Sequence, residues 1–151
     1  MVTMARAAIL DQEHARVGRW MHQEGSGHWS DGATCIGLER DGALVAGVMF
    51  DFYNGSMIVA NIVIRGPVTR EWLWFICHYP FVQLHCQVVI GLVAEENIAS
   101  HRFVQKFGFR HGLTIHDADP SGSLTLYTLR KEDCRFLRRS YYGQARSSAC
   151  A

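Results

Sequence analysis

The stretch that decides the fold is EENIASHRFVQKFGF, residues 95–109. It follows Gln87–Val93, an almost wholly apolar run whose length is typical of a buried strand. Asn97 is a favoured residue at a helix start, and the Gly-Phe pair at the end of the stretch is a stop signal. The stretch therefore predicts a strand–helix–strand unit, with a helix over Asn97–Phe107 and a further strand over Phe109–Ile115.

Upstream of this unit, tight turns separate three strand-like runs. Asp41-Gly42 and Asn54-Gly55 are dipeptides that adopt positive φ at little cost, which suits antiparallel hairpins. The three runs are Ala33–Glu39, Ala43–Phe52 and Ser56–Ile64. The third run is apolar on both faces apart from Asn61, so we expect it to lie centrally in a sheet with layers above and below.

Helical spacing of apolar residues indicates two further helices. The first is predicted over Asp11–Glu24, and the second begins at Thr69 and should end or kink at Pro80. The remaining predicted elements are a loop over Asp117–Ser123, a strand over Leu124–Arg130 and a short helix over Lys131–Arg139. Gly91, inside the strand at Gln87–Val93, predicts a bulge or a close backbone approach.

This order of elements predicts an α+β fold. A strand–helix–strand crossover after an antiparallel meander gives a mixed, mostly antiparallel sheet of about six to seven strands, flanked by helices on both faces. The length of 151 residues fits one domain, which we expect over residues 1–139. Residues 140–151 are polar, and we expect them to form a flexible tail.

Composition argues against several classes of function. The formal net charge is only +1, so we expect neither a nucleic-acid partner nor an anionic membrane surface. The apolar runs are far shorter than a membrane span, and the N-terminus lacks a signal-peptide pattern. The five cysteines include no C-x-x-C pair, which favours reduced thiols in a cytoplasmic protein.

Two adjacent residue pairs, Cys77-His78 and His85-Cys86, have the composition of metal ligands. Neighbouring residues on a helix or strand point in different directions, so neither pair can form a convergent site. We therefore expect no metal.

Two helix starts follow buried strands, one near Thr69 and the other near Asn97. Free N–H groups at a helix start, with the helix dipole behind them, favour an anion. The loop before the first of these helices is RGPVTR, residues 65–70, in which Gly66 allows close backbone approach and two arginines add positive charge. Taken alone, these features suit an ordinary turn and a plain helix cap as well as a diphosphate site.

The spacing from Asn97 to Phe109 resembles a motif of the GCN5-related N-acetyltransferase (GNAT) superfamily, N-x-x-A-x-x-x-Y-x-x-x-G-F. More narrowly, the chain resembles a subgroup encoded by phages and prophages. The segments that carry this likeness are TREWLWFICHYPFVQL at 69–84, GLVAEEN at 91–97 and YTLRKEDCRFL at 127–137. The likeness extends from roughly Gly37 to Leu137, most of the chain.

The resemblance implies acetyl-CoA as the donor, a small-molecule or peptide amine as the acceptor, and direct attack of the amine on the thioester. It also implies that strand Ser56–Ile64 splays from strand Gln87–Val93 and that the pantetheine arm pairs with the exposed strand edge. A backbone N–H near Ile62 would stabilise the tetrahedral oxyanion. The residues that the resemblance assigns to cofactor binding are Ile62, Val63, Ile64, Arg65, Gly66, Thr69, Arg70, Asn97 and Phe103.

Two features depart from the family pattern. The diphosphate loop usually has Arg or Gln, two residues, Gly, one residue and then Gly or Ala, whereas this chain has RGPVTRE. Val104 stands where many relatives carry a tyrosine that protonates the departing thiolate.

The general base stays open. The candidates at strand ends are Asp51, Asn61, His85 and Tyr127. The alternative function is a non-catalytic CoA-binding or protein-interaction module on the same fold. Trp74 lies off the main apolar stripe of its helix, which suggests a homodimer contact.

Overall fold

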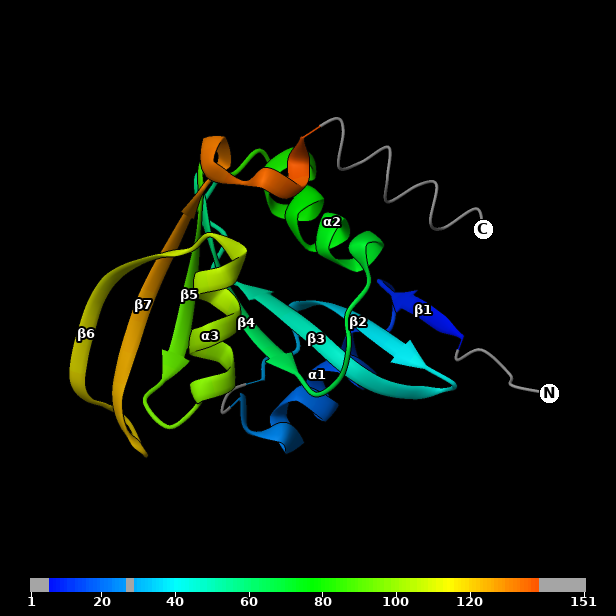
Figure 1. Ribbon diagram of the computed structural model, residues 1–151, viewed down its shortest axis with the longest axis horizontal. Helices are drawn as coiled ribbons and strands as arrows, with labels where there is room; N and C mark the ends of the chain where they lie inside the picture. The colour runs from blue at the N-terminus through cyan, green and yellow to red at the C-terminus, as the bar shows by residue number, and fades with distance from the viewer. Residues whose placement is uncertain (1–5, 27–28, 139–151) are drawn as a thin grey trace.

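The computed structural model describes residues 6–26 and 29–138, so the tail predicted over 140–151 lies outside the described residues. Within these ranges, seven strands form one sheet in the order β1-β2-β3-β4-β5-β7-β6 (Figure 1). Neighbouring strands are antiparallel except β4 and β5, which are parallel. The strands are β1 (Ala7–Leu10), β2 (Thr34–Arg40), β3 (Ala43–Asp51), β4 (Met57–Ile64), β5 (Val88–Ala94), β6 (Arg110–Asp119) and β7 (Gly122–Arg130). The predicted mixed, mostly antiparallel sheet is confirmed.

Helices cover both faces of this sheet. The α-helices in the described ranges are α1 (His14–Met21), α2 (Arg70–His78) and α3 (Ile98–Phe107). Because neighbours on a strand point to opposite faces, Val48 and Met49 of β3 belong to different cores. Met49 packs with Met21 of α1, whereas Val48 lies in the larger core with Trp72 of α2 and the buried residues of α3.

Helix α1 packs on the sheet over two glycines, which we call the glycine seat. Gly37 of β2 and Gly47 of β3 are register partners. A Cβ at Gly37 would lie 2.7 Å from Val17 Cγ2, and a Cβ at Gly47 would lie 3.0 Å from Met21 Cγ. The absence of side chains here lets α1 approach closely, and this fixes where the chain after α1 meets the sheet.

The N-terminal elements differ from the prediction. α1 begins at His14 rather than Asp11, where the Cys35 backbone N–H donates to His14 Nδ1 at 3.0 Å. The α-helical part ends at Met21, and a wider π turn, η1 (His22–Ser26), follows. Strand β1 is an addition that the sequence did not predict. Its four residues are too few to show alternation, and it exists because it pairs with β2.

The C-terminal elements differ as well. β6 continues to Asp119, so the predicted loop over Asp117–Ser123 shrinks to a turn between two strands. In place of the predicted helix over Lys131–Arg139, the described residues form two 3-10 turns, η3 (Lys131–Asp133) and η4 (Arg135–Leu137). Cys134 and Phe136 are both buried, and an i, i+2 spacing cannot lie on one face of an α-helix. Arg139 lies outside the described residues.

Proline and glycine act partly as expected. α2 ends two residues before Pro80, and the chain continues as a π turn, η2 (Tyr79–Gln83). The register of β5 with β7 runs through Gly91 without a shift, and its pairing with β4 runs without a shift up to Gly91, so there is no bulge at that residue. The ring of Phe109 lies against Gly91 instead, 3.4 Å from where a Cβ would stand. None of the helices in the described ranges is long and apolar enough to span a membrane.

Candidate functional site

A gap opens between β4 and β5, the two parallel strands at the centre of the sheet. They pair over only four positions, from Met57 with Val88 to Ala60 with Gly91. Beyond these pairs β4 keeps its ladder with β3, and β5 keeps its ladder with β7. The two strands therefore diverge towards their C-terminal ends, as Figure 1 shows.

The backbone of β4 offers hydrogen-bonding groups to this gap. The Arg65 N–H donates to Val45 O of β3 at 2.7 Å, and the backbone groups of successive strand residues point to alternate sides. Those of Val63 therefore face β3, whereas those of Ile62 and Ile64 face the gap. Accordingly, Ile62 O accepts from Ser100 Oγ of α3 at 3.4 Å.

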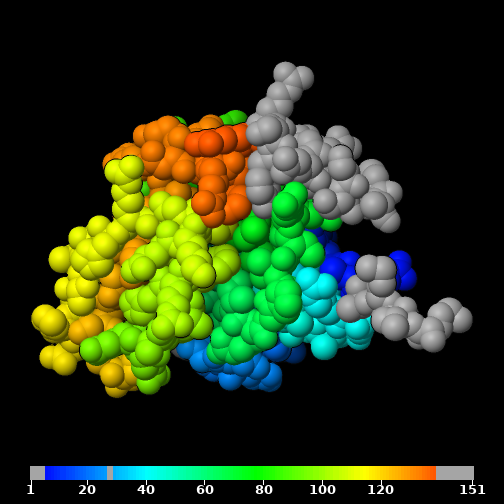
Figure 2. Space-filling model, viewed as in Figure 1, coloured from blue at the N-terminus to red at the C-terminus, as the bar shows by residue number. Residues whose placement is uncertain are grey.

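A cavity of about 300 Å³ lies at the open end of the gap. Its walls come from the end of η1, both diverging strands, the start of α3 and the turn between β6 and β7. The lining residues are Gly25, Ser26, Asn61, Ile62, Leu92, Ala94, Glu96, Asn97, Ser100, Asp119, Pro120, Ser121 and Leu124. In the space-filling view, α3 lies beside the segment that leads into α2 on the face shown (Figure 2).

The cavity wall carries two carboxylates among polar and apolar side chains. Glu96 and Asp119 both line it, and the Ser121 hydroxyl and backbone N–H, which donate to the Asp119 carboxylate, lower the pKa of Asp119. The Ser26 hydroxyl is shielded from solvent and has no hydrogen-bond partner among the described residues. Such a wall favours a cationic ligand with groups that can bond that hydroxyl.

Residues of the predicted diphosphate loop already have partners within the protein. Arg65 forms an ion pair with Glu24 of η1, with Nε 2.9 Å from Oε2, and also donates to Glu24 O. Gly66 packs against β3, since a Cβ there would lie 3.2 Å from Val45 Cβ. Thr69 caps α2 by accepting from Trp72 N at 3.1 Å, and Arg70 is the first residue of that helix.

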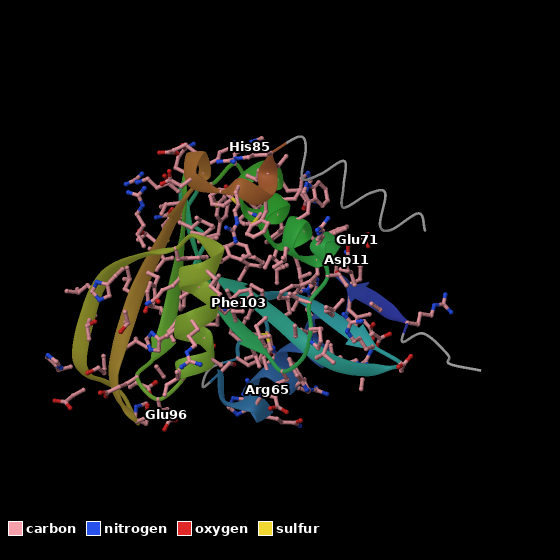
Figure 3. All side chains as sticks on the ribbon, in the orientation of Figure 1. Asp11, Arg65, Glu71, His85, Glu96 and Phe103 are labelled. Carbon is pink, nitrogen blue, oxygen red and sulfur yellow. The ribbon has the colours of Figure 1, made fainter. Side chains whose placement is uncertain are left out.

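The α3 residues behave as the sequence predicts for a helix start. Asn97 is the N-cap, and its Oδ1 accepts from Ser100 N at 3.2 Å. Phe103 is partly buried against the main core. Val104 is buried among apolar side chains. Figure 3 shows Arg65 and Glu96 at one end of the sheet, His85 at the other end and Phe103 between them.

The four candidate bases are not brought together. Asn61 lines the cavity. Asp51 accepts from Ser30 Oγ and Phe52 N, and its charge, second to burial, raises the pKa of Cys35 to about 11. His85 lies in an exposed turn before β5. The Tyr127 hydroxyl is buried behind α3, 2.7 Å from His101 Nδ1.

Sequence reasoning missed Glu24, Ser26, Ser100 and His101, all of which touch the gap or hold its walls. Of these residues, only Ser100 had a sequence signal: it lies on the buried stripe of α3. Buried positions seldom carry a hydroxyl without a hydrogen-bond partner, so this serine predicts a buried polar contact. The described residues contain no group of three or more His, Cys, Asp or Glu that could hold a metal ion.

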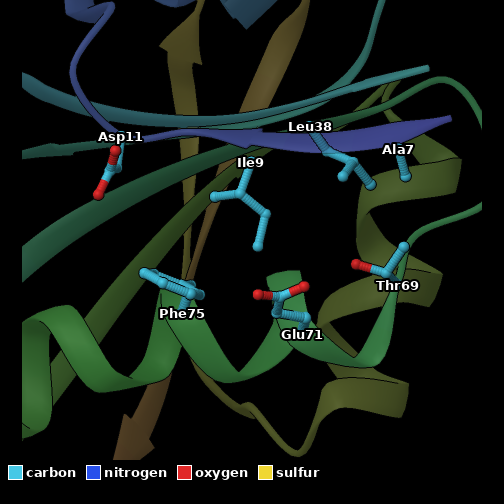
Figure 4. A pocket seen from close by; sticks show the side chains of 7 residues that line it. All are labelled: Ala7, Ile9, Asp11, Leu38, Thr69, Glu71 and Phe75. Carbon is cyan, nitrogen blue, oxygen red and sulfur yellow. The ribbon is translucent and has the colours of Figure 1, made fainter. Parts of the chain in front are cut away.

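A second cavity, of about 280 Å³, lies between β1 and the first half of α2 (Figure 4). Asp11 and Glu71 stand on its walls, with Ile9 and Phe75 between them. This second cavity shares no lining residue with the cavity at the gap. The buried side-chain polar atoms that lack a hydrogen-bond partner among the described residues belong to residues that do not line it.

No family model and no curated protein matches this chain. Its solved structural neighbours include spermidine N-acetyltransferase SpeG of Vibrio cholerae, as the N152L mutant, with a TM-score of 0.66, 13% identity and coverage of 89% of this chain and 98% of that chain. The chain has the GNAT fold.

Two further GNAT-fold neighbours agree. A proposed acetyltransferase of Salmonella typhimurium, yncA, whose structure holds acetyl-CoA, gives a TM-score of 0.63 at 13% identity over 85% of this chain and 96% of that chain. A proposed phosphinothricin N-acetyltransferase gives 0.61 at 14% identity over 83% and 98%. At such identities the similarity establishes the fold alone, and the narrower likeness to a phage-type subgroup stays a prediction.

Proposed function

We propose that this protein is an acyl-CoA-dependent N-acyltransferase, which moves an acetyl group from acetyl-CoA to an amine. The observation that carries the proposal is the gap between β4 and β5, where backbone groups of a central parallel strand face a cavity instead of another strand. Backbone groups left without a ladder partner suit an extended, amide-bearing ligand arm.

The residues at the gap fit such an arm. Ile62 and Ile64 of β4 would hold it through their backbone groups, and Asn97 through its amide side chain. The N-termini of α2 and α3, with Thr69 and Arg70, would favour the diphosphate. Phe103 would flank the arm from α3. Acetyl-CoA supplies an activated thioester when bound.

The proposed chemistry is direct transfer without an acyl-enzyme. The cavity would hold the amine beside the thioester, and proximity would supply much of the rate. The Ile62 N–H, aimed at the gap, would donate to the oxyanion as the amine attacks. Asn61, which lines the cavity, could hold a water that accepts the amine proton, whereas Asp51, His85 and Tyr127 do not line it.

The acceptor that suits this cavity is a small amine with positive charge. Glu96 and Asp119 supply negative charge at the wall. The structural neighbour SpeG is a spermidine N-acetyltransferase, which supports a small-molecule acceptor over a peptide. We also propose that the protein is cytoplasmic and that it forms a homodimer.

A second candidate is a CoA-binding protein without transferase activity. Two observations favour it: Arg65 is engaged by Glu24, and Val104 offers no hydroxyl to the leaving thiolate. Both readings require CoA to bind at the gap.

Calorimetry with acetyl-CoA, followed by a thiol-release assay across a panel of amines, tests both readings. An enzyme gives saturable binding and amine-dependent release of free CoA. Binding without release for any amine leaves the second candidate. The absence of both heat and thermal shift at millimolar acetyl-CoA contradicts both.

A further inference from the structure

Two consecutive residues of α3 reach opposite sides of the gap. Ser100 Oγ donates to Ile62 O of β4 at 3.4 Å, and His101 Nε2 lies 3.0 Å from Ala94 O at the end of β5. Successive helix positions are about 100° apart, so adjacent side chains can point to different neighbours. The first turn of α3 therefore holds both strands at the place where they diverge.

The carbonyl partner of His101 identifies one ring nitrogen as a hydrogen-bond donor. A carbonyl oxygen only accepts, so Nε2 carries the proton that is donated to Ala94 O. The other ring nitrogen, Nδ1, forms a hydrogen bond with the Tyr127 hydroxyl at 2.7 Å. Gln105 Nε2 in turn donates to the Tyr127 oxygen at 3.4 Å. The imidazole is held from both sides.

The same bonds hold the turn that carries Asn97. Ala94 O accepts from the Asn97 N–H at 3.0 Å as well as from His101, so its two lone pairs are both used. Asn97 in turn accepts from Ser100 N through its side chain. Ala94, Asn97 and Ser100 all line the cavity at the gap. Ser100 is thus part of the cavity wall, and a change at His101 reaches that wall through one hydrogen bond, to Ala94 O.

We propose that Ser100 and His101 are positioning residues which act as a brace: Ser100 ties α3 to β4, His101 ties α3 to β5, and together they set the width of the gap. Their effect on acetyl-CoA binding rests on the proposed function. The effect on the two strands does not.

The burial of Ser100 supports a role of this kind. Ser100 is 5% exposed and shares its helix stripe with Val104 and Phe107, both of which are apolar and buried. Alanine would fill that position without desolvating a hydroxyl. The hydroxyl instead contacts a carbonyl that points into the gap.

The test replaces His101 with two different amides, each of which keeps the hydrogen bond of only one ring nitrogen. In His101→Gln, the amide nitrogen takes the place of Nε2 and keeps the donor to Ala94 O. In His101→Asn, the amide takes the place of Nδ1 and keeps only the partner of Tyr127. Ser100→Ala removes the tie to β4. Tyr53→Phe removes the hydroxyl bond to Leu84 O, remote from the gap, and serves as the control for a lost hydrogen bond.

We expect the dissociation constant of acetyl-CoA to rise about fivefold to tenfold in His101→Asn and Ser100→Ala, corresponding to one hydrogen bond each, and to change less than about twofold in His101→Gln and Tyr53→Phe. Without cofactor, hydrogen exchange at the Leu92 amide and at the Asn97 amide, which donates to Ala94 O, should be faster in the first two variants than in the last two.

Equal affinities for His101→Asn and His101→Gln would overturn the proposal, and so would unchanged exchange at both amides in variants whose melting temperature has fallen. If the native protein does not bind acetyl-CoA, the proposed function fails, and the exchange data alone still decide whether the brace exists.

Discussion

Asn97 combines a structural contact with a place in the proposed binding site. Its side chain caps α3, and the same amide lines the cavity at the gap. Capping uses the side-chain oxygen as an acceptor, which leaves the amide nitrogen free to donate to a ligand carbonyl. A cap alone would be served as well by serine or aspartate.

The first prediction separates these two uses. Asn97→Ala should lower the free energy of unfolding by about 1 kcal/mol through loss of the cap. It should also weaken acetyl-CoA binding by more than that amount, because the donor to the arm is lost. Chemical denaturation and calorimetry measure the two effects on the same sample.

Asn97→Ser is the matched variant, since serine keeps the cap and removes the amide. It should fold with nearly native stability and still bind acetyl-CoA more weakly. Native affinity in Asn97→Ser would mean that Asn97 is only a cap.

At the scale of elements, the position of α1 matters most, because η1 at its end supplies Gly25 and Ser26 to the cavity wall. The helix approaches the sheet over Gly37 and Gly47, which leave no room for a side chain. The cavity wall therefore depends on two glycines on the face of β2 and β3 that α1 covers, although neither glycine lines the cavity.

The second prediction tests this seat. Gly47→Ala should lower the free energy of unfolding by about 1–3 kcal/mol, because Met21 must move or α1 must lift from the sheet. Lifting α1 also displaces Ser26, so acetyl-CoA turnover should fall in the folded fraction. Thermal unfolding and thiol-release rates measure the two effects.

Gly32→Ala provides the control, since a Cβ at Gly32 meets nothing within 4 Å. It should leave stability and turnover near native values. A Gly47→Ala protein as stable as Gly32→Ala would show that α1 does not rest on the glycine seat.

At the scale of the whole molecule, the sheet consists of two halves that are joined through four residue pairs of β4 and β5. The first turn of α3 ties the two halves at the open end, through Ile62 O of β4 and Ala94 O of β5. On the β4 side of the gap, an ion pair joins Arg65, after β4, to Glu24 of η1. This ion pair holds an arginine that the family resemblance assigns to the diphosphate. Under the proposed function, Glu24 would therefore compete with the cofactor for Arg65.

The third prediction follows from that competition. Glu24→Gln should tighten acetyl-CoA binding by about twofold to fivefold, the range expected for releasing a surface ion pair. The gain should shrink as salt is raised, because exposed charges are screened. Titration calorimetry at two ionic strengths measures both effects.

Glu13→Gln is the comparison, since Glu13 also pairs with an exposed arginine, Arg16, away from the cavity. It should leave affinity unchanged. Weaker binding in Glu24→Gln would instead mean that the ion pair supports the site.

The sequence by itself determined the order of most elements and the two ends of α3. Asn97, Gly108, the Asp-Gly and Asn-Gly turns and the apolar runs are local signals, and local signals act through backbone conformations that neighbouring residues alone can favour. They were sufficient to predict the mixed sheet and to recognise the resemblance that motivates the proposed function.

Only the tertiary structure decided which groups meet at the gap. Strand β1 forms by pairing with β2, Glu24 meets Arg65 across 41 positions, and Ser100 meets Ile62 across 38. Such contacts depend on the packing of α1 and α3 against a completed sheet. No local pattern encodes the distance between residues so far apart in the chain, because that distance is set by every element packed between them.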